Sequence, residues 1–232
     1  MTGLALTCLI PAHNEAARIG AVLRAVAGHP LVARVLVIDD GSTDATAAIA
    51  RAAGVQVIAP PHNLGKTGAL ILGLRQVTQG HLLLLDADLT GLTPDAITAL
   101  IAPVADGRAM ASLSLRGNAP RTWRRIGVDY ITGERVLPHA LLAGHLDQIA
   151  ALPRFGFEVF LNRLLIAADQ PIAIVPWPGV ASPSKVSKRG VLRGIKADAA
   201  MMSDIFRTLG PTACLRQIIA MRRLAGRSDS AG

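Results

Sequence analysis

Four consecutive leucines followed by Asp-Ala-Asp constrain the fold of this chain more than any other segment. An uninterrupted apolar run such as residues 82–85 is typical of a strand that is buried on both faces of a sheet. Because residues i and i+2 of an extended segment point to the same side, Asp86 and Asp88 should direct two carboxylates toward one spot where the strand ends. Paired carboxylates at that end of a strand suit a divalent cation. The alternative interpretation is that one aspartate caps a helix and the other is solvated.

Short apolar runs alternate with segments of helical periodicity in the first half of the chain. We expect Asn14 to cap the first helix and Gly28, Gly54 and Gly80 to end the first three. The β-α-β-α order with short loops predicts a mostly parallel sheet covered by helices. The expected strands are residues 4–10, 34–38, 55–58, 81–85 and 110–115, and the expected helices are residues 15–27, 44–53, 67–78 and 94–101.

The alternation breaks after residue 116, and the second half has a more helical pattern. A loop or short helix is expected at residues 116–125, and a loop rich in proline, serine and lysine at 176–189. No internal repeat or clear boundary divides the chain, so we expect a single domain over residues 1–232. The expected helices are residues 133–143, 156–168, 191–209 and 212–224, and one short strand is expected at 171–175.

The charge of the chain points to an anionic partner. The net charge is +8, and most basic residues follow residue 116. A positive field of this kind favours phosphorylated substrates, anionic lipid surfaces or nucleic acid. Nucleic acid fits least, because aromatic residues make up only 3% of the chain and no nucleic-acid-binding motif is present. We therefore expect no nucleic-acid partner.

Composition also bears on location. The longest apolar runs are far below the ~20 residues of a membrane helix. Residues 4–10 indicate a first strand rather than a signal peptide, because no basic segment precedes them. Cys8 and Cys214 lie far apart in the sequence, so we expect no disulfide framework, which fits a reducing compartment. We expect a cytoplasmic protein, with peripheral association at the inner membrane surface as an open alternative.

Four polar motifs follow predicted strands or precede a predicted helix, and the shared direction of parallel strands should bring them to one edge of the sheet. The third motif is not a phosphate-binding P-loop, because Pro60 stands where that loop needs its first glycine. The four motifs are Pro11-Ala12-His13-Asn14-Glu15, Asp39-Asp40-Gly41-Ser42, Asn63-Leu64-Gly65-Lys66-Thr67-Gly68-Ala69-Leu70 and Asp86-Ala87-Asp88.

In this order and spacing the motifs resemble those of the family 2 glycosyltransferases with the GT-A fold, including bacterial relatives of dolichyl- and polyprenyl-phosphate sugar transferases. The resemblance implies an α/β GT-A fold, with a mostly parallel central sheet flanked by helices and a helical acceptor half. Residues 1–115 would form the nucleotide-sugar-binding half, residues 116–211 the acceptor half, and residues 212–232 a basic amphipathic helix and tail. The implied reaction is inverting transfer of a sugar from a UDP- or GDP-sugar, assisted by Mg²⁺ or Mn²⁺.

The resemblance also assigns roles on the donor side of the site. Asp88 would bind the metal ion and is thereby a catalytic residue, because the ion neutralises charge on the leaving diphosphate. Asp86 would contact the nucleotide or share the ion. Asp40, preferred over Asp39, would accept a hydrogen bond from the base. Lys66 would place an ammonium near a phosphate or the base. The remaining nucleotide-sugar-binding residues would be Pro11, Ala12 and His13 along the base, Glu15 at the ribose hydroxyls, and Ala87.

On the acceptor side, Gly133-Glu134-Arg135 and Gly156-Phe157-Glu158 resemble two short family segments. Glu158 is the first candidate for the general base and Glu134 the second. One departure concerns the loop at residues 180–188, where many relatives carry a histidine that completes the metal shell. This loop has no histidine, so either Ser182 or water would take that place, or the metal affinity would be weak. Lys185, Lys188 and Arg189 could hold the diphosphate or an anionic acceptor.

Several functions remain open from the sequence. The acceptor could be an anionic group such as a lipid phosphate, or a small soluble phospho-acid or sugar. A nucleotidyltransferase is disfavoured, because its glycine-rich first loop is replaced here by Pro-Ala-His-Asn-Glu. A nucleotide-sugar-binding protein without catalytic activity is a further alternative. The helix at 212–224 suits either docking on anionic lipid or packing on its own domain, and the sequence defines no oligomeric state.

Overall fold

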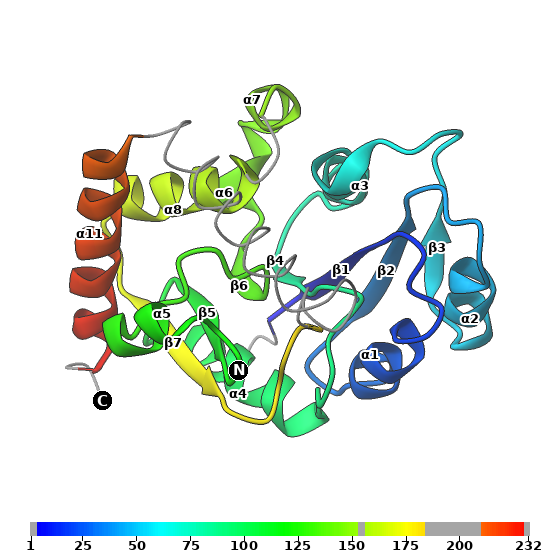
Figure 1. Ribbon diagram of the computed structural model, residues 1–232, viewed down its shortest axis with the longest axis horizontal. Coiled ribbons are helices and arrows are strands. Elements are labelled where there is room, and N and C mark those ends of the chain that lie inside the picture. The colour runs from blue at the N-terminus through cyan, green and yellow to red at the C-terminus, as the bar shows by residue number, and fades with distance from the viewer. Residues whose placement is uncertain (1–3, 153–155, 184–209, 230–232) are drawn as a thin grey trace.

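The computed structural model describes residues 4–152, 156–183 and 210–229. Within them seven strands form one sheet with the order β3-β2-β1-β4-β6-β5-β7 (Figure 1). Neighbouring strands are parallel, except that β6 is antiparallel to both β4 and β5. The expectation of a mostly parallel sheet is confirmed. The strands are β1 (Leu6–Ala12), β2 (Arg34–Asp39), β3 (Gln56–Ile58), β4 (His81–Leu84), β5 (Ala111–Arg116), β6 (Arg135–Pro138) and β7 (Ile172–Trp177).

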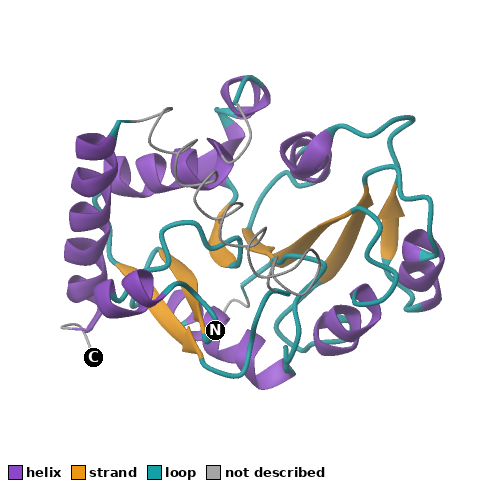
Figure 2. Cartoon of the chain, in the orientation of Figure 1, coloured by secondary structure: helices purple, strands orange, loops and turns teal. Residues whose placement is uncertain are grey.

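Helices cover both faces of the sheet and give three layers (Figure 2). One apolar cluster joins the sheet to α1, α2 and α4, and another joins its opposite face to α3, α8 and α11. The helices are α1 (Ile19–Val26), α2 (Thr46–Ala52), α3 (Gly65–Leu74), α4 (Pro94–Ala105), α5 (Arg121–Ile126), α6 (Ala140–Ala143), α7 (Leu146–Ala150), α8 (Gly156–Ala168) and α11 (Pro211–Asp229).

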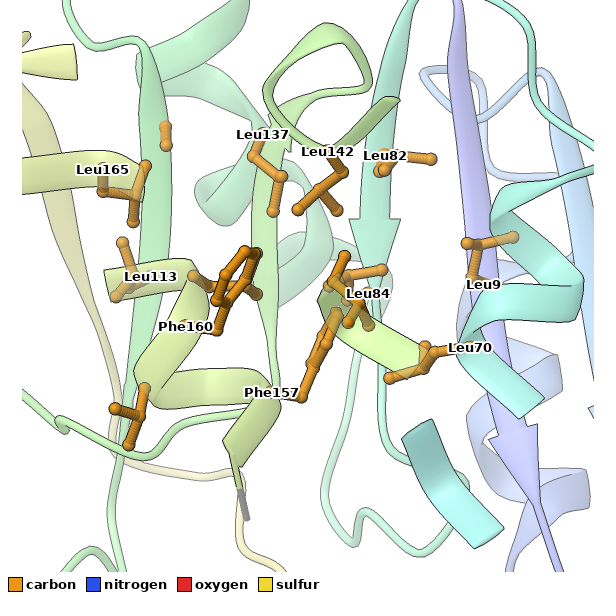
Figure 3. Close-up of a cluster of buried hydrophobic side chains, with 14 of the residues drawn as sticks. Leu9, Leu70, Leu82, Leu84, Leu113, Leu137, Leu142, Phe157, Phe160 and Leu165 are labelled. Carbon is orange, nitrogen blue, oxygen red and sulfur yellow. The ribbon is translucent and has the colours of Figure 1, made fainter. Parts of the chain in front are cut away.

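The leucine run of β4 lies at the centre of this packing. Its side chains alternate between the two faces, so Leu82 and Leu84 belong to the cluster on the α3 and α8 side, whereas Leu83 and Leu85 belong to the other cluster. All four are at most 3% exposed, as a strand covered on both faces requires. Figure 3 shows Leu84 close to Phe157 at the start of α8. The core thereby fixes the point at which the chain leaves β4 and the Asp-Ala-Asp segment begins.

Glycines end the first two helices as predicted. Gly28 and Gly54 directly follow the C-cap residues of α1 and α2 and have positive φ angles of 76° and 74°, a conformation that costs glycine little because it has no Cβ. The prediction that Gly80 ends the third helix is wrong, because α3 already ends at Leu74 and Gly80 lies immediately before β4.

The prediction of Asn14 as the cap of the first helix is wrong. α1 begins at Ile19 without a side-chain cap, and Asn14 instead accepts a 2.8 Å hydrogen bond from the Thr43 backbone N–H. The side chain therefore joins the first two polar loops.

The expected helix at residues 133–143 is also wrong. Residues 135–138 form β6, which fills the sheet between β4 and β5, and only α6 is helical in this segment. Tertiary pairing with two neighbouring strands outweighs the weak helical pattern of such a short segment. The segment at 116–125 contains the short helix α5, and the expected helix at 156–168 is α8.

The last predicted helix is longer than expected. α11 begins at Pro211 and continues to Asp229 rather than ending near residue 224. The expected helix at 191–209 and the lysines of the preceding loop lie outside the described residues. Among the described residues, no helix combines the length and apolar character needed to cross a membrane.

Candidate active site

The first two strands and β4 bring three polar loops to one edge of the sheet. β1 is parallel to both β2 and β4, so their carboxyl ends share an edge. The backbone N–H of Asp40 donates to the carbonyl of Ala12 at 2.8 Å, and that of Leu85 donates to Leu9 at 3.1 Å. These bonds hold the strand ends in register beyond the regular ladder. The predicted convergence of the polar loops is observed, and the edge is the usual ligand position in an open α/β sheet.

An open cleft of about 270 Å³ lies at this edge. It contains every residue predicted on the donor side, together with Ala69 of α3, which the sequence reasoning missed. Ala69 could have been noticed as a small residue one turn after Lys66. The lining residues are Pro11, Ala12, His13, Glu15, Asp40, Lys66, Ala69, Asp86, Ala87 and Asp88.

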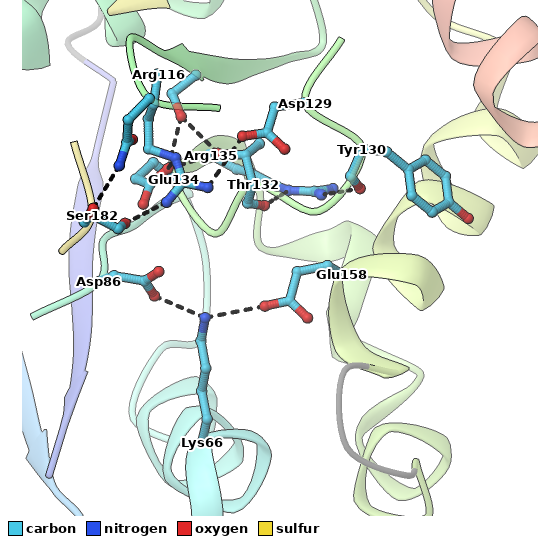
Figure 4. A network of polar contacts seen from close by, with 12 residues as sticks. Lys66, Asp86, Arg116, Asp129, Tyr130, Thr132, Glu134, Arg135, Glu158 and Ser182 are labelled. Carbon is cyan, nitrogen blue, oxygen red and sulfur yellow. Dashed lines mark hydrogen bonds and ion pairs between the residues drawn. The ribbon is translucent and has the colours of Figure 1, made fainter. Parts of the chain in front are cut away.

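Lys66 lies between two carboxylates that come from distant parts of the chain (Figure 4). Its Nζ is 2.8 Å from Asp86 Oδ1 and 3.1 Å from Glu158 Oε1. Lys66 is in the first turn of α3 and Glu158 is in the first turn of α8. Glu158 lies outside the open cleft, but it lines a narrower cavity that also contains Lys66 and Asp86. The candidate base and the metal motif are thus joined through one ammonium group.

The ion pairs shift the pKa values of both partners. Burial alone would lower the pKa of Lys66, but Asp86 and Glu158 outweigh it and raise that pKa above its usual range. Burial would likewise raise the pKa of Asp86, whereas Lys66 and, more weakly, Arg116 lower it. Asp86 is therefore ionised and Lys66 protonated near neutral pH. Lys66 remains 45% exposed, so it can reach a ligand in the cleft.

Asp40 is anchored by the loop that precedes α3. Its Oδ1 accepts a 2.6 Å hydrogen bond from the Leu64 backbone N–H, and its carbonyl oxygen accepts a 2.8 Å hydrogen bond from the Asn63 side chain. The carbonyl also lies 2.9 Å from His13 Nδ1. Asp40, and not the neighbouring Asp39, lines the cleft. One carboxylate oxygen is thereby fixed by the backbone while the group borders the cavity.

A buried polar network supports the acceptor side of the site. Arg116 Nη2 lies 3.1 Å from Asp129 Oδ2, and Arg116 Nε lies 3.6 Å from Glu134 Oε2, with both acidic side chains fully buried. Glu134 Oε2 also accepts hydrogen bonds from Ser114 at 2.8 Å and Thr132 at 2.6 Å. Glu134 lines neither cavity. This environment makes Glu134 a structural group and disfavours it as the general base.

Two residues of the Gly133-Glu134-Arg135 segment line the narrow cavity, although the sequence assigned no role to either of them. Gly133 packs so closely that a Cβ placed on it would lie 3.0 Å from both carboxylate oxygens of Asp86. Arg135 is fully buried and donates to Asn162 Oδ1 at 2.7 Å and to the Thr132 carbonyl at 2.9 Å. Their positions depend on β6, which the sequence analysis assigned to a helix. The turn before β6 therefore sets the space around Asp86.

The loop that follows β7 reaches the same region. Thr90 and Ala181 exchange backbone hydrogen bonds of 2.8 and 3.0 Å. These bonds attach the loop to Thr90, which follows Asp88 by two residues in the sequence. Ser182 accepts a hydrogen bond from the Arg116 guanidinium through its hydroxyl and from Asn118 at 2.6 Å through its carbonyl. With a cationic group already at its hydroxyl, Ser182 is a poor substitute for a metal-binding histidine.

The carboxylates of the cleft can hold a divalent cation only together with further ligands such as substrate phosphates and water. Among the residues that the structure describes, no three histidine, cysteine or acidic side chains gather as a metal site. Asp86 and Asp88 both border the cleft. Mg²⁺ is commonly held by one or two carboxylates together with substrate phosphates and water. The donor set fits an ion that arrives with a diphosphate rather than one bound by the protein alone.

Comparison with solved structures defines the class of fold as that of the GT-A glycosyltransferases. A crystal structure of glucosyl-3-phosphoglycerate synthase from Mycobacterium tuberculosis with Mn²⁺, UDP and glucosyl-3-phosphoglycerate has a TM-score of 0.67 and 23% identity. The match covers 93% of this chain and 80% of that chain. The complex of the same enzyme with phosphoglyceric acid gives 0.65 and 24%, over 87% and 80% of the two chains. At these identities the likeness shows the fold.

The family follows from sequence. Residues 7–151 match the model of glycosyl transferase family 2, which is more than half of the chain, and the protein belongs to that family. Relatives include the 4,4'-diaponeurosporenoate glycosyltransferases of Staphylococcus aureus strains MRSA252 and USA300, which are 39% and 37% identical over 102 residues. These matches cover 42% of this chain, and the chain spans 27% of the length of these relatives. The predicted fold and family are confirmed.

Proposed function

We propose that this protein is a glycosyltransferase that moves a sugar from a UDP- or GDP-sugar to an anionic acceptor with the help of Mg²⁺ or Mn²⁺. The observation that carries the proposal is the open cleft at the carboxyl edge of the sheet, which is lined by residues from all four polar motifs. Its volume of about 270 Å³ suits part of a nucleotide sugar in an open groove. The M. tuberculosis neighbours that carry Mn²⁺ or Mg²⁺ with UDP support the choice of ion and donor.

On the donor side, Asp40 would recognise the base. Its backbone-anchored carboxylate is an acceptor, and uracil and guanine each present a ring N–H, whereas cytosine and adenine present an unprotonated ring nitrogen at the corresponding place. His13, with Pro11 and Ala12, would lie along the base, and Glu15 would accept from the ribose hydroxyls.

Asp88 would hold the divalent ion, with Asp86 as its partner on the same strand end. When bound, the ion neutralises negative charge on the leaving diphosphate. Asp86 has Lys66 as a counterion at 2.8 Å, and the resemblance to the family assigns the main metal contact to Asp88. Lys66 would add a second positive charge at the diphosphate side of the cleft, at the start of α3 where free N–H groups favour anions.

On the acceptor side, Glu158 would act as the general base. A hydroxyl acceptor gives its proton to the carboxylate while its oxygen bonds to the anomeric carbon. The bond between that carbon and the diphosphate oxygen breaks, and the nucleotide leaves as the diphosphate. Attack from the opposite face inverts the anomeric configuration. Glu158 lies 3.1 Å from Lys66 Nζ, so its carboxylate is held toward the donor.

The acceptor is the less defined partner. Phosphoglyceric acid in the M. tuberculosis neighbour supports a small anionic acceptor. The 4,4'-diaponeurosporenoate glycosyltransferases among the relatives are named for a different acid, and a lipid phosphate is the alternative acceptor. A hydroxyl acceptor and a lipid phosphate acceptor differ in whether the reaction needs a general base. A hydroxyl needs a base, whereas a phosphate oxygen is already ionised near neutral pH.

A transfer assay tests the proposal. Release of UDP or GDP from a donor panel is measured with 3-phosphoglycerate or a short polyprenyl phosphate as acceptor, and the product is examined by NMR for anomeric configuration. With a hydroxyl acceptor, Glu158→Gln should lower kcat about 10²- to 10⁴-fold, whereas Glu158→Gln should spare a phosphate acceptor. Retained configuration, or full activity of Glu158→Gln on a hydroxyl acceptor, would contradict the assigned base.

A further inference from the structure

The C-terminal helix α11 has two chemically different faces. Cys214, Ile218, Met221 and Leu224 are at most 8% exposed and belong to the cluster that packs on α8 and the sheet. Helical periodicity alone groups Leu215 and Ile219 with this apolar side. The structure places them elsewhere, because they are 58% and 44% exposed. They are among the few large apolar side chains exposed in the described part of the chain.

Arginines surround these two apolar side chains. Arg216, Arg222 and Arg223 are exposed, and their spacing of three and four residues from Ile219 puts them on the same face of the helix. None of the three pairs with a carboxylate among the residues that the structure describes. Arg227 differs, because it pairs with Asp169 at 2.8 Å. We call the surface of Leu215, Arg216, Ile219, Arg222 and Arg223 the α11 outer face.

The charge of the α11 outer face is one-sided. Asp229, at the very end of the helix, is the only acidic residue of α11. Two apolar side chains one turn apart are flanked by arginines that have no carboxylate partner within the described part of the chain. This is the pattern of a helix that lies in a lipid interface with its apolar groups shallowly inserted. A second protein chain would need a larger apolar area than two side chains supply. Anionic headgroups match both the positive charge and the small apolar area.

The orientation of α11 in the molecule is compatible with this partner. α11 forms one edge of the molecule, with its long axis across the ends of α8 and β7 (Figure 1). It is held there by its buried side, and Gln217 accepts a 2.6 Å hydrogen bond from Tyr130. Glu158 is on the neighbouring helix α8. A planar surface that contacts α11 would therefore lie beside the half of the chain that carries the candidate base.

We propose that the α11 outer face docks on an anionic lipid surface, with Leu215 and Ile219 entering the headgroup region and the three arginines pairing with lipid phosphates. The docking does not require the proposed sugar transfer, and the two can be measured separately. Since electrostatic attraction supplies much of the binding, the affinity should fall as salt is added.

Co-sedimentation of the purified chain with vesicles tests this docking. Vesicles of equal parts phosphatidylglycerol and phosphatidylcholine should pellet the protein at low salt and release it at about 0.5 M salt, whereas pure phosphatidylcholine vesicles should not bind. Arg222→Glu/Arg223→Glu should weaken binding at least about 30-fold. Leu215→Ser/Ile219→Ser should weaken it about 10-fold or more, because the apolar contribution is lost.

The matched control is Arg51→Glu/Arg75→Glu, which makes the same change in net charge at exposed arginines of α2 and the end of α3. It should stay within about twofold of the wild type if binding is localised. Thermal unfolding shows whether the variants fold, and donor turnover without vesicles reports on the proposed function by itself.

Three results would overturn the docking proposal: no binding to anionic vesicles at low salt, equal losses in Arg222→Glu/Arg223→Glu and the control, or a dimer in light scattering that Leu215→Ser/Ile219→Ser abolishes. The last result would assign the α11 outer face to a second copy of the chain. Selective loss of vesicle binding in the two α11 variants, with donor turnover in solution unchanged, is the result that supports it.

Discussion

Lys66 Nζ lies 2.8 Å from Asp86 Oδ1, so the first aspartate of the Asp-Ala-Asp segment has a protein cation as its partner. The same ammonium lies 3.1 Å from Glu158 Oε1. Lys66 thereby connects the donor side of the cleft to the helix that carries the candidate base. Asp86 therefore orients a lysine, and in the proposed function Asp88 would hold the metal ion together with the donor.

The pairing predicts a specific pH dependence of stability. The pKa of Asp86 is lowered in the folded protein, so its contribution is present above the ordinary aspartate pKa of about 4 and is lost as the pH falls through the lower folded-state value. Urea unfolding of the wild type should therefore lose stability below about pH 4 more steeply than Asp86→Asn. Asp106→Asn, at an exposed pair with Arg108, should follow the wild type. Parallel curves for wild type and Asp86→Asn would contradict this role of Lys66.

Gly133 predicts a steric effect on Asp86. An alanine Cβ would lie 3.0 Å from both oxygens of that carboxylate, and the ion pair with Lys66 resists its displacement. We expect Gly133→Ala to lower kcat/KM about 10- to 100-fold with a loss of unfolding free energy of about 1–2 kcal/mol. Gly144→Ala is the matched control, since nothing lies within 4 Å of its added Cβ. Equal activity of the two variants would show that Asp86 tolerates movement.

Asp40 allows a test of base recognition that leaves the loop intact. Asp40→Asn keeps an oxygen for the Leu64 N–H, which donates at 2.6 Å in the wild type, and replaces the other oxygen with a donor. UDP affinity measured by calorimetry should fall about 10- to 100-fold, as expected for a lost hydrogen bond to a charged group. CDP should gain relative to UDP, because its ring nitrogen accepts a hydrogen bond. An unchanged ratio of UDP to CDP affinity would remove Asp40 from base recognition.

Arg116 predicts a large stability effect. Its side chain is 13% exposed and forms ion pairs with two fully buried acidic side chains, Asp129 and Glu134. Arg116→Met removes their shared cation and should cost about 3–5 kcal/mol in chemical denaturation. Arg108→Met removes an exposed ion pair with Asp106 and should cost less than about 1 kcal/mol. Similar losses in both variants would mean that the buried pair contributes no more than a surface one.

The position of the cleft follows from local sequence, because the carboxyl ends of parallel strands share an edge whatever the rest of the chain does. Asp40, Lys66, Asp86 and Asp88 could therefore be placed together from their motifs. The ion pair between Lys66 and Glu158 could not be predicted, since it depends on how α8 packs against the sheet. The close approach of Gly133 to Asp86 could not be predicted for a related reason: β6 is recognisable as a strand only when β4 and β5 are already beside it.

The outer residues of α11 show the same limit. Periodicity alone grouped Leu215 and Ile219 with Ile218 and Leu224, because all four lie within a broad apolar arc. Which part of the arc is buried depends on where α8 and β7 contact the helix. Of these four side chains, Ile218 and Leu224 are buried, whereas Leu215 and Ile219 are exposed. The exposed pair became visible through packing rather than through composition.

Metal-dependent donor binding tests the central claim most directly. Thermal unfolding of the wild type and Asp88→Asn is measured with a panel of UDP- and GDP-sugars, each with Mn²⁺ or with EDTA. At about 100 times Kd, at least one donor should raise the Tm of the wild type by roughly 5–10 °C with Mn²⁺. The shift should be much smaller with EDTA and in Asp88→Asn. Equal shifts with and without metal, a wild-type response in Asp88→Asn, or no response to any donor would contradict the account.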